Sequence, residues 1–329
     1  MNAGTEQSPP GTGHWFAGIP ILRALGQTPF EVVVRVPGDR FLSAPLPVAP
    51  SAERHWEFAW MSLAAYAGTP AGLKRRQQDA LLDAKHPART APDGTPLSYR
   101  DPVPVLAQAG WSRWPQFEPL SMWQQIENAH LRVEVWENHT RGALAVAFGG
   151  TVFDDWKDWL SNLRWFIPWH DDEYTQVVRT FGPAFVGEYK RRFAHLPGPK
   201  LFSTGHSLGG GLAQQFAYAL PPDPAGIVPR VSEVYAFDPS PVTGYFSVAP
   251  ELRDSNKREL SIGRIYERGE ILALARSLMN LVEKPTAQAP AIGGTRYSLF
   301  YGWNPIADHS IVQLAYKIDR AAHAEVAGS

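Results

Sequence analysis

The chain of 329 residues contains no cysteine. Disulfides, thiolate zinc sites and cysteine nucleophiles are therefore excluded. Charged residues make up only 19% of the chain and the formal net charge is −1, which argues against nucleic-acid binding and against general attraction to an anionic membrane. No run of about 18 consecutive apolar residues is present, so we expect no transmembrane helix.

The first residues contain neither a basic segment nor an apolar one, so they do not resemble a signal peptide. We therefore expect a cytoplasmic protein, or one that is exported by a route without a signal peptide. Residues 1–50 are interpreted as a partly disordered N-terminal extension, and residues 51–329 as a single domain. The 44% content of hydrophobic residues is enough to build a large buried core in that domain.

Strand patterns and helix patterns alternate along the chain. Strands are expected at residues 30–36, 131–135, 143–148, 201–204, 231–237 and 262–266. Helices are expected at residues 56–66, at 171–195 with a kink at Gly182–Pro183, after residue 211, and near the C-terminal end, whereas residues 37–53 are interpreted as a proline-rich connection. This alternation predicts an α/β fold with a mostly parallel central sheet and helices on both faces.

The most informative motif is the run from Thr204 to Gly211, which contains the pattern G-x-S-x-G around Ser207. An apolar strand precedes it and a helical pattern follows it, which is the context of the nucleophile elbow of α/β-hydrolases. In such an elbow a strained backbone exposes the serine hydroxyl, and Gly205 and Gly209 allow strand and helix to approach closely. The alternative is a glycine-rich turn in which the serine only caps the helix.

A catalytic serine needs a base to take its proton, and in α/β-hydrolases the chain order is serine, acid, histidine. Two histidines follow Ser207. His309 lies in a loop that opens the terminal helix and is the predicted base, whereas His323 lies close to the C-terminal end. The alternative for His309 is a residue that only caps or packs the helix.

Two carboxylates between the serine and the histidine are candidates for the acid. Glu270 comes shortly after the expected strand 262–266, and Asp238 directly follows the strand 231–237. Either carboxylate can hold the imidazole in the required tautomer, and either can instead be a turn residue. Asp308 ranks third, because adjacent side chains tend to point apart and it adjoins the predicted base.

The oxyanion of the transition state needs N–H donors. One predicted donor is the backbone of Leu208, and the second is Thr151, in the loop after the strand 143–148. Residues 154–169 contain four of the 12 tryptophans and are expected to form either a lid or wall of an acyl pocket or ordinary core. The aromatic residues proposed for that pocket are Trp156, Trp159, Trp165, Phe166 and Trp169.

Four segments together resemble the class 3 lipase family of α/β-hydrolases, which includes the fungal triacylglycerol lipases. They are residues 146–151, 158–163, 204–212 and 309–310. The resemblance covers about residues 56–320 and implies the α/β-hydrolase fold. Gly149 departs from the family pattern, which usually has an arginine at that position.

The resemblance assigns the nucleophile to Ser207 and the base to His309, with Thr151 and Leu208 as the oxyanion hole. It favours Glu270 over Asp238 as the acid, because Glu270 occupies a place similar to that of the family's aspartate.

These residues predict a serine carboxylic-ester hydrolase, a lipase that cleaves acylglycerols or phospholipids through an acyl-enzyme. We expect a lipid or other ester substrate, bound at a lipid–water interface, and no metal or organic cofactor. A soluble short-chain or aryl esterase is the alternative enzyme. A catalytically inactive lipid-binding or partner-binding module is the alternative of another class, because one fold can carry several functions.

Overall fold

The computed structural model describes residues 31–66, 102–115, 131–150, 177–193, 198–269, 286–299 and 310–323. The strands in these ranges are β1 (Glu31–Arg35), β2 (Ser112–Arg113), β3 (Val133–Asn138), β4 (Ala143–Phe148), β5 (Lys200–His206), β6 (Val231–Phe237), β7 (Ser261–Glu267) and β8 (Ala291–Ser298). The α-helices are α2 (Ala49–Ala64), α4 (Pro102–Gln108), α8 (Gly182–Phe193), α9 (Leu208–Ala219), α10 (Pro250–Asn256) and α12 (Ile311–His323). Shorter helical turns are η3 (Val177–Phe181), η4 (Tyr245–Ser247) and η5 (Lys257–Glu259).

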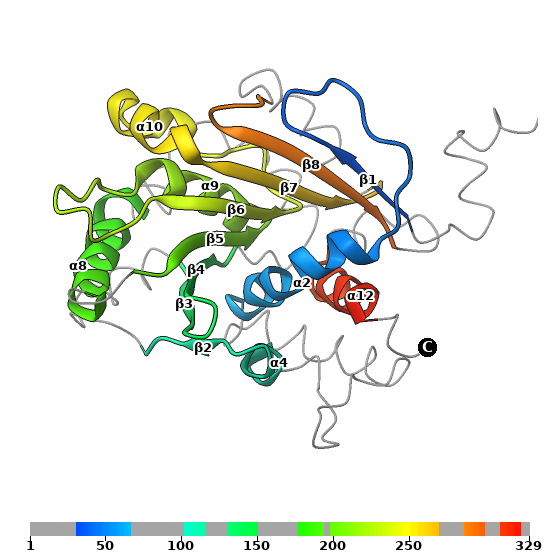
Figure 1. Cartoon of the computed structure of the whole chain (residues 1–329), viewed down its shortest axis with the longest axis horizontal. Helices are drawn as coiled ribbons and strands as arrows, with labels where there is room; N and C mark the ends of the chain where they lie inside the picture. The colour runs from blue at the N-terminus through cyan, green and yellow to red at the C-terminus, as the bar shows by residue number, and fades with distance from the viewer. Residues whose placement is uncertain are drawn as a thin grey trace, which may run out of the picture.

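These strands form one sheet in the order β1-β8-β7-β6-β5-β4-β3-β2 (Figure 1). Neighbouring strands from β4 to β8 are parallel. The pairs β1–β8, β2–β3 and β3–β4 are antiparallel. The predicted mostly parallel sheet is therefore confirmed, and the carboxyl ends of β4 to β8 lie along one edge of the sheet.

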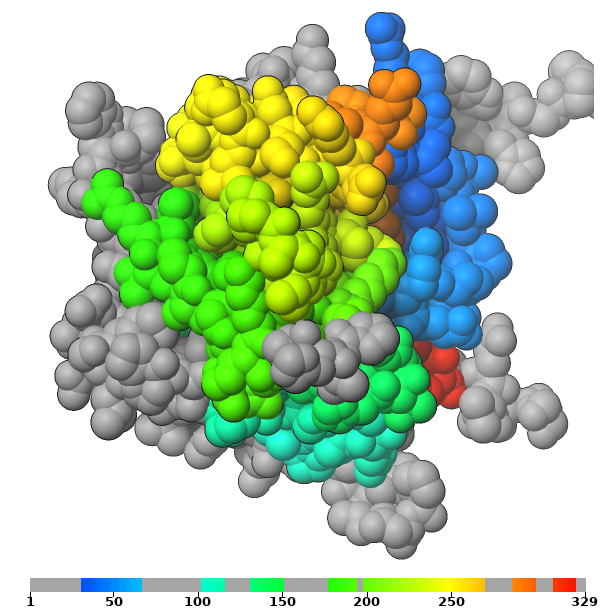
Figure 2. Space-filling view, turned by 60° about the vertical axis from the view of Figure 1, so that its left-hand side comes forward, coloured from blue at the N-terminus to red at the C-terminus, as the bar shows by residue number. Residues whose placement is uncertain are grey.

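Helices cover both faces of this sheet. The helices α2 and α12 pack against each other over one face and bury a first hydrophobic cluster. The helices α8 and α9 and the turn η3 pack over the opposite face and bury a second cluster, and α10 packs on α9. Figure 2 shows this second side of the molecule, where the α10 region (yellow) and the α8 region (green) lie at the surface.

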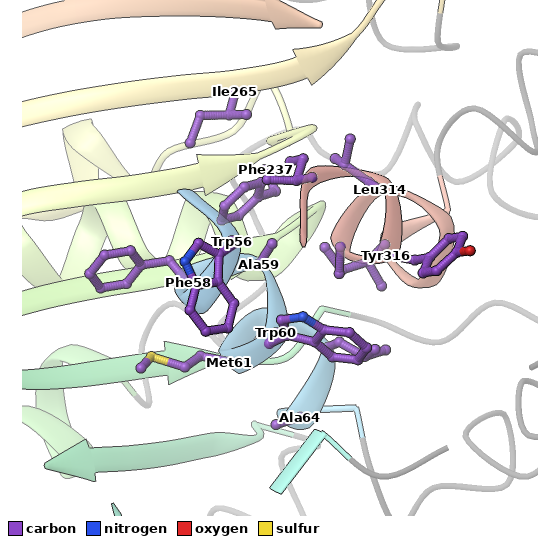
Figure 3. Close-up of a cluster of buried hydrophobic side chains, with 14 of the residues drawn as sticks. Trp56, Phe58, Ala59, Trp60, Met61, Ala64, Phe237, Ile265, Leu314 and Tyr316 are labelled. Atoms are coloured by element: carbon purple, nitrogen blue, oxygen red, sulfur yellow. The ribbon is translucent and has the colours of Figure 1, made fainter. Parts of the chain in front are cut away.

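The sequence of β4 explains how both faces are filled. Every residue of β4 is buried, and successive side chains point to opposite faces of the sheet. The three alanines face the first cluster, whereas Leu144, Val146 and Phe148 face the second. Because the alanine side chains on the first face are short, the aromatic side chains of α2 can pack close to the sheet, as the cluster in Figure 3 shows.

Helix α2 is buried along most of its length, because it lies between the sheet and α12, with α4 also against it. The helix begins at Ala49, so the expectation of a connection through residue 53 was wrong at its end. Pro50 stands in the first turn of α2, where a proline is tolerated because its missing N–H has no acceptor inside the helix.

Other expected elements can be compared directly with the structure. Within the helical pattern expected at 171–195, the described residues 177–193 form the π-helical turn η3 followed by α8 from Gly182, so the expected irregularity falls at the Gly182–Pro183 pair. The strand β1 lies within residues 1–50, the expected extension, and pairs with β8 in the central sheet. None of the helices in the described ranges is both long enough and apolar enough to span a membrane.

Candidate active site

Ser207 stands at the turn between β5 and α9. Its backbone has φ 57° and ψ −123°, which is a sterically unfavourable region for a residue with a Cβ atom. The strand ends at His206 and the helix begins at Leu208, so the strand–turn–helix context predicted for the G-x-S-x-G motif is confirmed. About 9% of Ser207 is exposed to solvent.

Backbone hydrogen bonds hold this strained turn in place. The N–H of Ser207 donates to the carbonyl oxygen of Phe237 at 3.0 Å, which ties the turn to the last residue of β6. The carbonyl oxygen of Ser207 accepts from the N–H of Ser240 at 2.9 Å and from that of Gly210 at 3.0 Å. The serine is therefore fixed by the neighbouring strand, by the loop after it and by the first turn of its own helix.

Glycines make this close approach possible. A Cβ on Gly205 would overlap the carbonyl group of Gly209, and a Cβ on Gly209 would overlap the carbonyl oxygen of Phe148. A Cβ on Gly150 would lie 2.8 Å from the carbonyl oxygen of His206. The end of β4, the turn after β5 and the start of α9 therefore meet at a junction packed to backbone contact.

One predicted oxyanion donor lies at this junction. Leu208 is the first residue of α9, so its N–H belongs to the four that have no acceptor inside the helix. The N-terminal end of a helix also carries a partial positive charge, which favours an anion. The Gly149–Gly150 pair follows β4 at the same junction, but Thr151, the second predicted donor, lies outside the described residues.

Asp238, the alternative acid, directly follows β6 and is fully buried. Its backbone has φ 39°, in the left-handed region that aspartate tolerates better than most residues. Its N–H donates to the carbonyl oxygen of Ile265 at 2.7 Å, and its Oδ1 accepts from the N–H of Glu267 at 3.3 Å. Asp238 therefore lies one residue from the acceptor of the Ser207 N–H and also links the ends of β6 and β7.

Glu267 is a buried carboxylate that the sequence analysis did not single out. It is the last residue of β7, and its Oε1 accepts from the N–H of Leu299 at 2.9 Å, just beyond β8. The two buried carboxylates thus link the ends of neighbouring strands, from β6 to β7 and from β7 to β8. The only sequence signal was its position directly after the expected strand 262–266.

The remaining predicted site residues lie outside the described ranges. They are Glu270, His309, Trp156, Trp159, Trp165, Phe166 and Trp169. The rejected histidine, His323, ends α12, where its ring meets that of Trp56 at 4.9 Å between centroids. The structure therefore brings together Ser207, Leu208 and Asp238, and the other assignments stay predictions. Within the described ranges, no group of three or more His, Cys, Asp or Glu side chains could hold a metal ion.

Comparisons with known proteins add one similarity in sequence. No protein-family model matches the chain. A stretch of 74 residues is 43% identical to the extracellular phospholipase A1 of Serratia liquefaciens. The stretch covers 22% of this chain and 20% of that protein, so the match spans about a fifth of the length of the phospholipase.

Similar solved structures include fungal lipases. The lipase–propeptide complex of Rhizomucor miehei gives a TM-score of 0.39 at 11% identity, over 72% of this chain and 64% of that chain. The Lip2 lipase of Yarrowia lipolytica gives a TM-score of 0.39 at 13% identity, over 68% of this chain and 72% of that chain. The sheet order, the covering helices and the strained serine turn are features of this chain itself. By these features, the chain has the α/β-hydrolase fold.

Proposed function

We propose that this chain is a serine carboxylic-ester hydrolase that cleaves acylglycerols or phospholipids through an acyl-enzyme. The observation that carries the proposal is the backbone of Ser207, with φ 57° at the turn between β5 and α9. A serine that only capped a helix would have ordinary extended backbone angles and would bond to the first turn through its side chain. Ser207 makes no such side-chain bond to its helix.

The proposed reaction has two halves. Ser207 Oγ attacks the acyl carbonyl carbon while His309 takes its proton, and His309 then gives that proton to the leaving alcohol. In the second half, His309 takes a proton from water as the oxygen of that water attacks the acyl carbonyl carbon. The bond from that carbon to Ser207 Oγ then breaks, His309 returns the proton to Ser207 Oγ, and the acid is released. Glu270 holds the imidazole, and the N–H groups of Leu208 and Thr151 stabilise the oxyanion in both halves.

The acid of the triad has a second candidate, Asp238. Asp238 lies beside the serine turn, but the structure gives one of its oxygens a bond to the backbone at the end of β7. We therefore keep Glu270 as the proposed acid and Asp238 as its alternative.

The substrate class is proposed on two grounds. The segment 154–169 supplies aromatic residues in number, which favours an apolar acyl chain. The stretch similar to a phospholipase A1 supports an ester of a lipid, with a glycerophospholipid as the first substrate to try.

The test is ester hydrolysis by the wild-type chain and by Ser207→Ala, using a p-nitrophenyl ester series from short to long acyl chains and phosphatidylcholine vesicles. We expect Ser207→Ala and His309→Ala each to lose about 10⁴-fold in kcat, and the double variant to lose little more, because the triad acts as a unit. Release of fatty acid from the vesicles is measured in parallel.

Ser240→Ala is the matched control. Ser240 lies beside Ser207 and is buried, but it contacts the serine turn through its backbone N–H, which alanine keeps. We expect its kcat to stay within a few fold of wild type. Activity on short or aryl esters alone would support the esterase alternative. Undiminished hydrolysis by Ser207→Ala, or no hydrolysis by the wild type on any ester, would overturn the proposal.

A further inference from the structure

The C-terminal end of α2 lies along β5, next to the serine turn. Ser62 Oγ is 2.9 Å from Thr204 Oγ1, and the hydroxyl of Tyr66, in the turn just after α2, reaches His206, two residues later on β5. The end of α2 and the turn after it therefore follow β5 up to the residue before the nucleophile.

The hydroxyl of Tyr66 makes two contacts with His206. It lies 3.1 Å from Nδ1 of the imidazole and 3.1 Å from the carbonyl oxygen of the same residue. A hydroxyl has one proton to donate. Because a carbonyl oxygen can only accept, the hydroxyl donates to that oxygen, and Nδ1 of His206 must carry a proton to make the other contact attractive.

The same hydroxyl also packs against the loop after β4. A Cβ on Gly150 would overlap the Tyr66 hydroxyl, and it would lie 3.2 Å from the backbone nitrogen of Gly209. Tyr66 is 3% exposed, so water does not compete freely for these contacts. One buried oxygen atom thus touches both the residue before the nucleophile and the glycine before the predicted oxyanion donor Thr151.

We propose that Tyr66 is a positioning residue for catalysis, an inference that rests on the proposed function. Its hydroxyl sets the spacing between the serine turn and the glycine loop after β4, and so fixes the nucleophile relative to the oxyanion donors. Tyr66 acts through His206 and through the glycine loop after β4, which its hydroxyl contacts. A misplacement of about 1 Å at such a site can cost about 100-fold in rate, with little effect on substrate binding.

The test is the Tyr66→Phe variant, which removes one oxygen atom. We expect kcat to fall about tenfold to 100-fold while KM stays within about twofold, because the misplaced donors act on the transition state. The rate of covalent labelling by a fluorophosphonate probe, which reacts with the serine through a charged transition state, should fall by a similar factor.

Tyr297→Phe is the matched control. Tyr297 is also fully buried, and its hydroxyl lies 2.8 Å from Nδ1 of a histidine, His55 on α2, but Tyr297 belongs to β8 and its histidine partner is not next to the nucleophile. We expect its kcat to stay within about twofold of wild type. Equal losses of kcat in the two variants would mean a general effect of losing a buried hydroxyl and would overturn the inference.

Two variants of His206 test the same Tyr66–His206 contact through its other partner. They replace the first test if Tyr66→Phe does not fold. His206→Asn keeps a nitrogen donor near the position of Nδ1, whereas His206→Leu does not. We expect Asn to retain kcat within a few fold and Leu to lose as much as Tyr66→Phe. Equal kcat in both would overturn the inference. A wild type that neither hydrolyses esters nor reacts with the probe would instead defeat the proposed function.

Discussion

Replacing Ser207 by glycine and by alanine separates the backbone strain of the turn from the loss of the hydroxyl. Both variants lack the nucleophile, but only alanine keeps the Cβ that makes φ 57° unfavourable. Strain of this kind costs about 1–3 kcal/mol. Glycine also gains about 0.5–1 kcal/mol of conformational freedom in the unfolded chain, which opposes the relief.

The midpoints of these two ranges predict that Ser207→Gly unfolds with a free energy about 1.3 kcal/mol higher than Ser207→Ala. An unfolding entropy of about 2.1 cal/mol/K per residue gives about 0.7 kcal/mol/K for this chain, so the glycine variant should melt about 1–3 °C higher. Urea unfolding followed by circular dichroism measures the free energy, and a thermal scan under the same buffer measures the Tm.

Ser261, an ordinary strand position in β7, provides the control. There glycine should be less stable than alanine by about 0.5–1 kcal/mol, because no strain is relieved. Opposite signs at the two positions are the expected result. If glycine is no more stable than alanine at Ser207, the turn is not strained, and the argument for a nucleophile elbow loses its basis.

The acid, the glycine junction and a buried histidine give three more predictions. Glu270→Gln should lower kcat far more than Asp238→Asn, and the reverse order in steady-state kinetics would move the acid to Asp238. Gly209→Ala should lower the free energy of unfolding in urea by about 3 kcal/mol, because its methyl group would overlap a backbone carbonyl. Gly187→Ala, on α8 with open space around it, should raise the free energy of unfolding by about 0.5–1 kcal/mol. Similar free energies of unfolding for the two variants would contradict the packing argument. Burial, and then a neighbouring arginine charge, lowers the pKa of His55 to about 3 from 6.5, so the stability from its neutral ring is complete above pH 6.5 and is lost as the pH falls towards 3. Between these two pH values the free energy of unfolding should drop by about 1.4 kcal/mol per pH unit. A His55→Gln variant whose free energy of unfolding has the same pH slope as that of the wild type would refute this.

The sequence was most informative where local pattern and structure agree. The turn at Ser207 and the strands around it were predicted because glycine spacing and buried apolar runs are local signals. The strand β8 was missed because Gly293 and Gly294 interrupt its apolar alternation, and its place in the sheet depends on β1 and β7 on either side.

Short helices were missed for a related reason. The seven residues of α4 include two prolines, and α10 is equally short, so neither has a helical period that stands out from the sequence. Such helices are stabilised by the elements they pack on rather than by their own propensity. Tyr66 had no signal at all, because its partner His206 lies far along the chain and only the packed fold brings them together.

The antiparallel pairing of β1 with β8 has a consequence for the order of folding. These strands come from opposite ends of the chain, and so do the two helices α2 and α12, which pack together over the same face. During synthesis, β3 to β6 and their helices are made early enough to pair while the rest is still being added. The cluster under α2 can close only after α12 has been made, so the side of the sheet that carries Tyr66 reaches its final packing last.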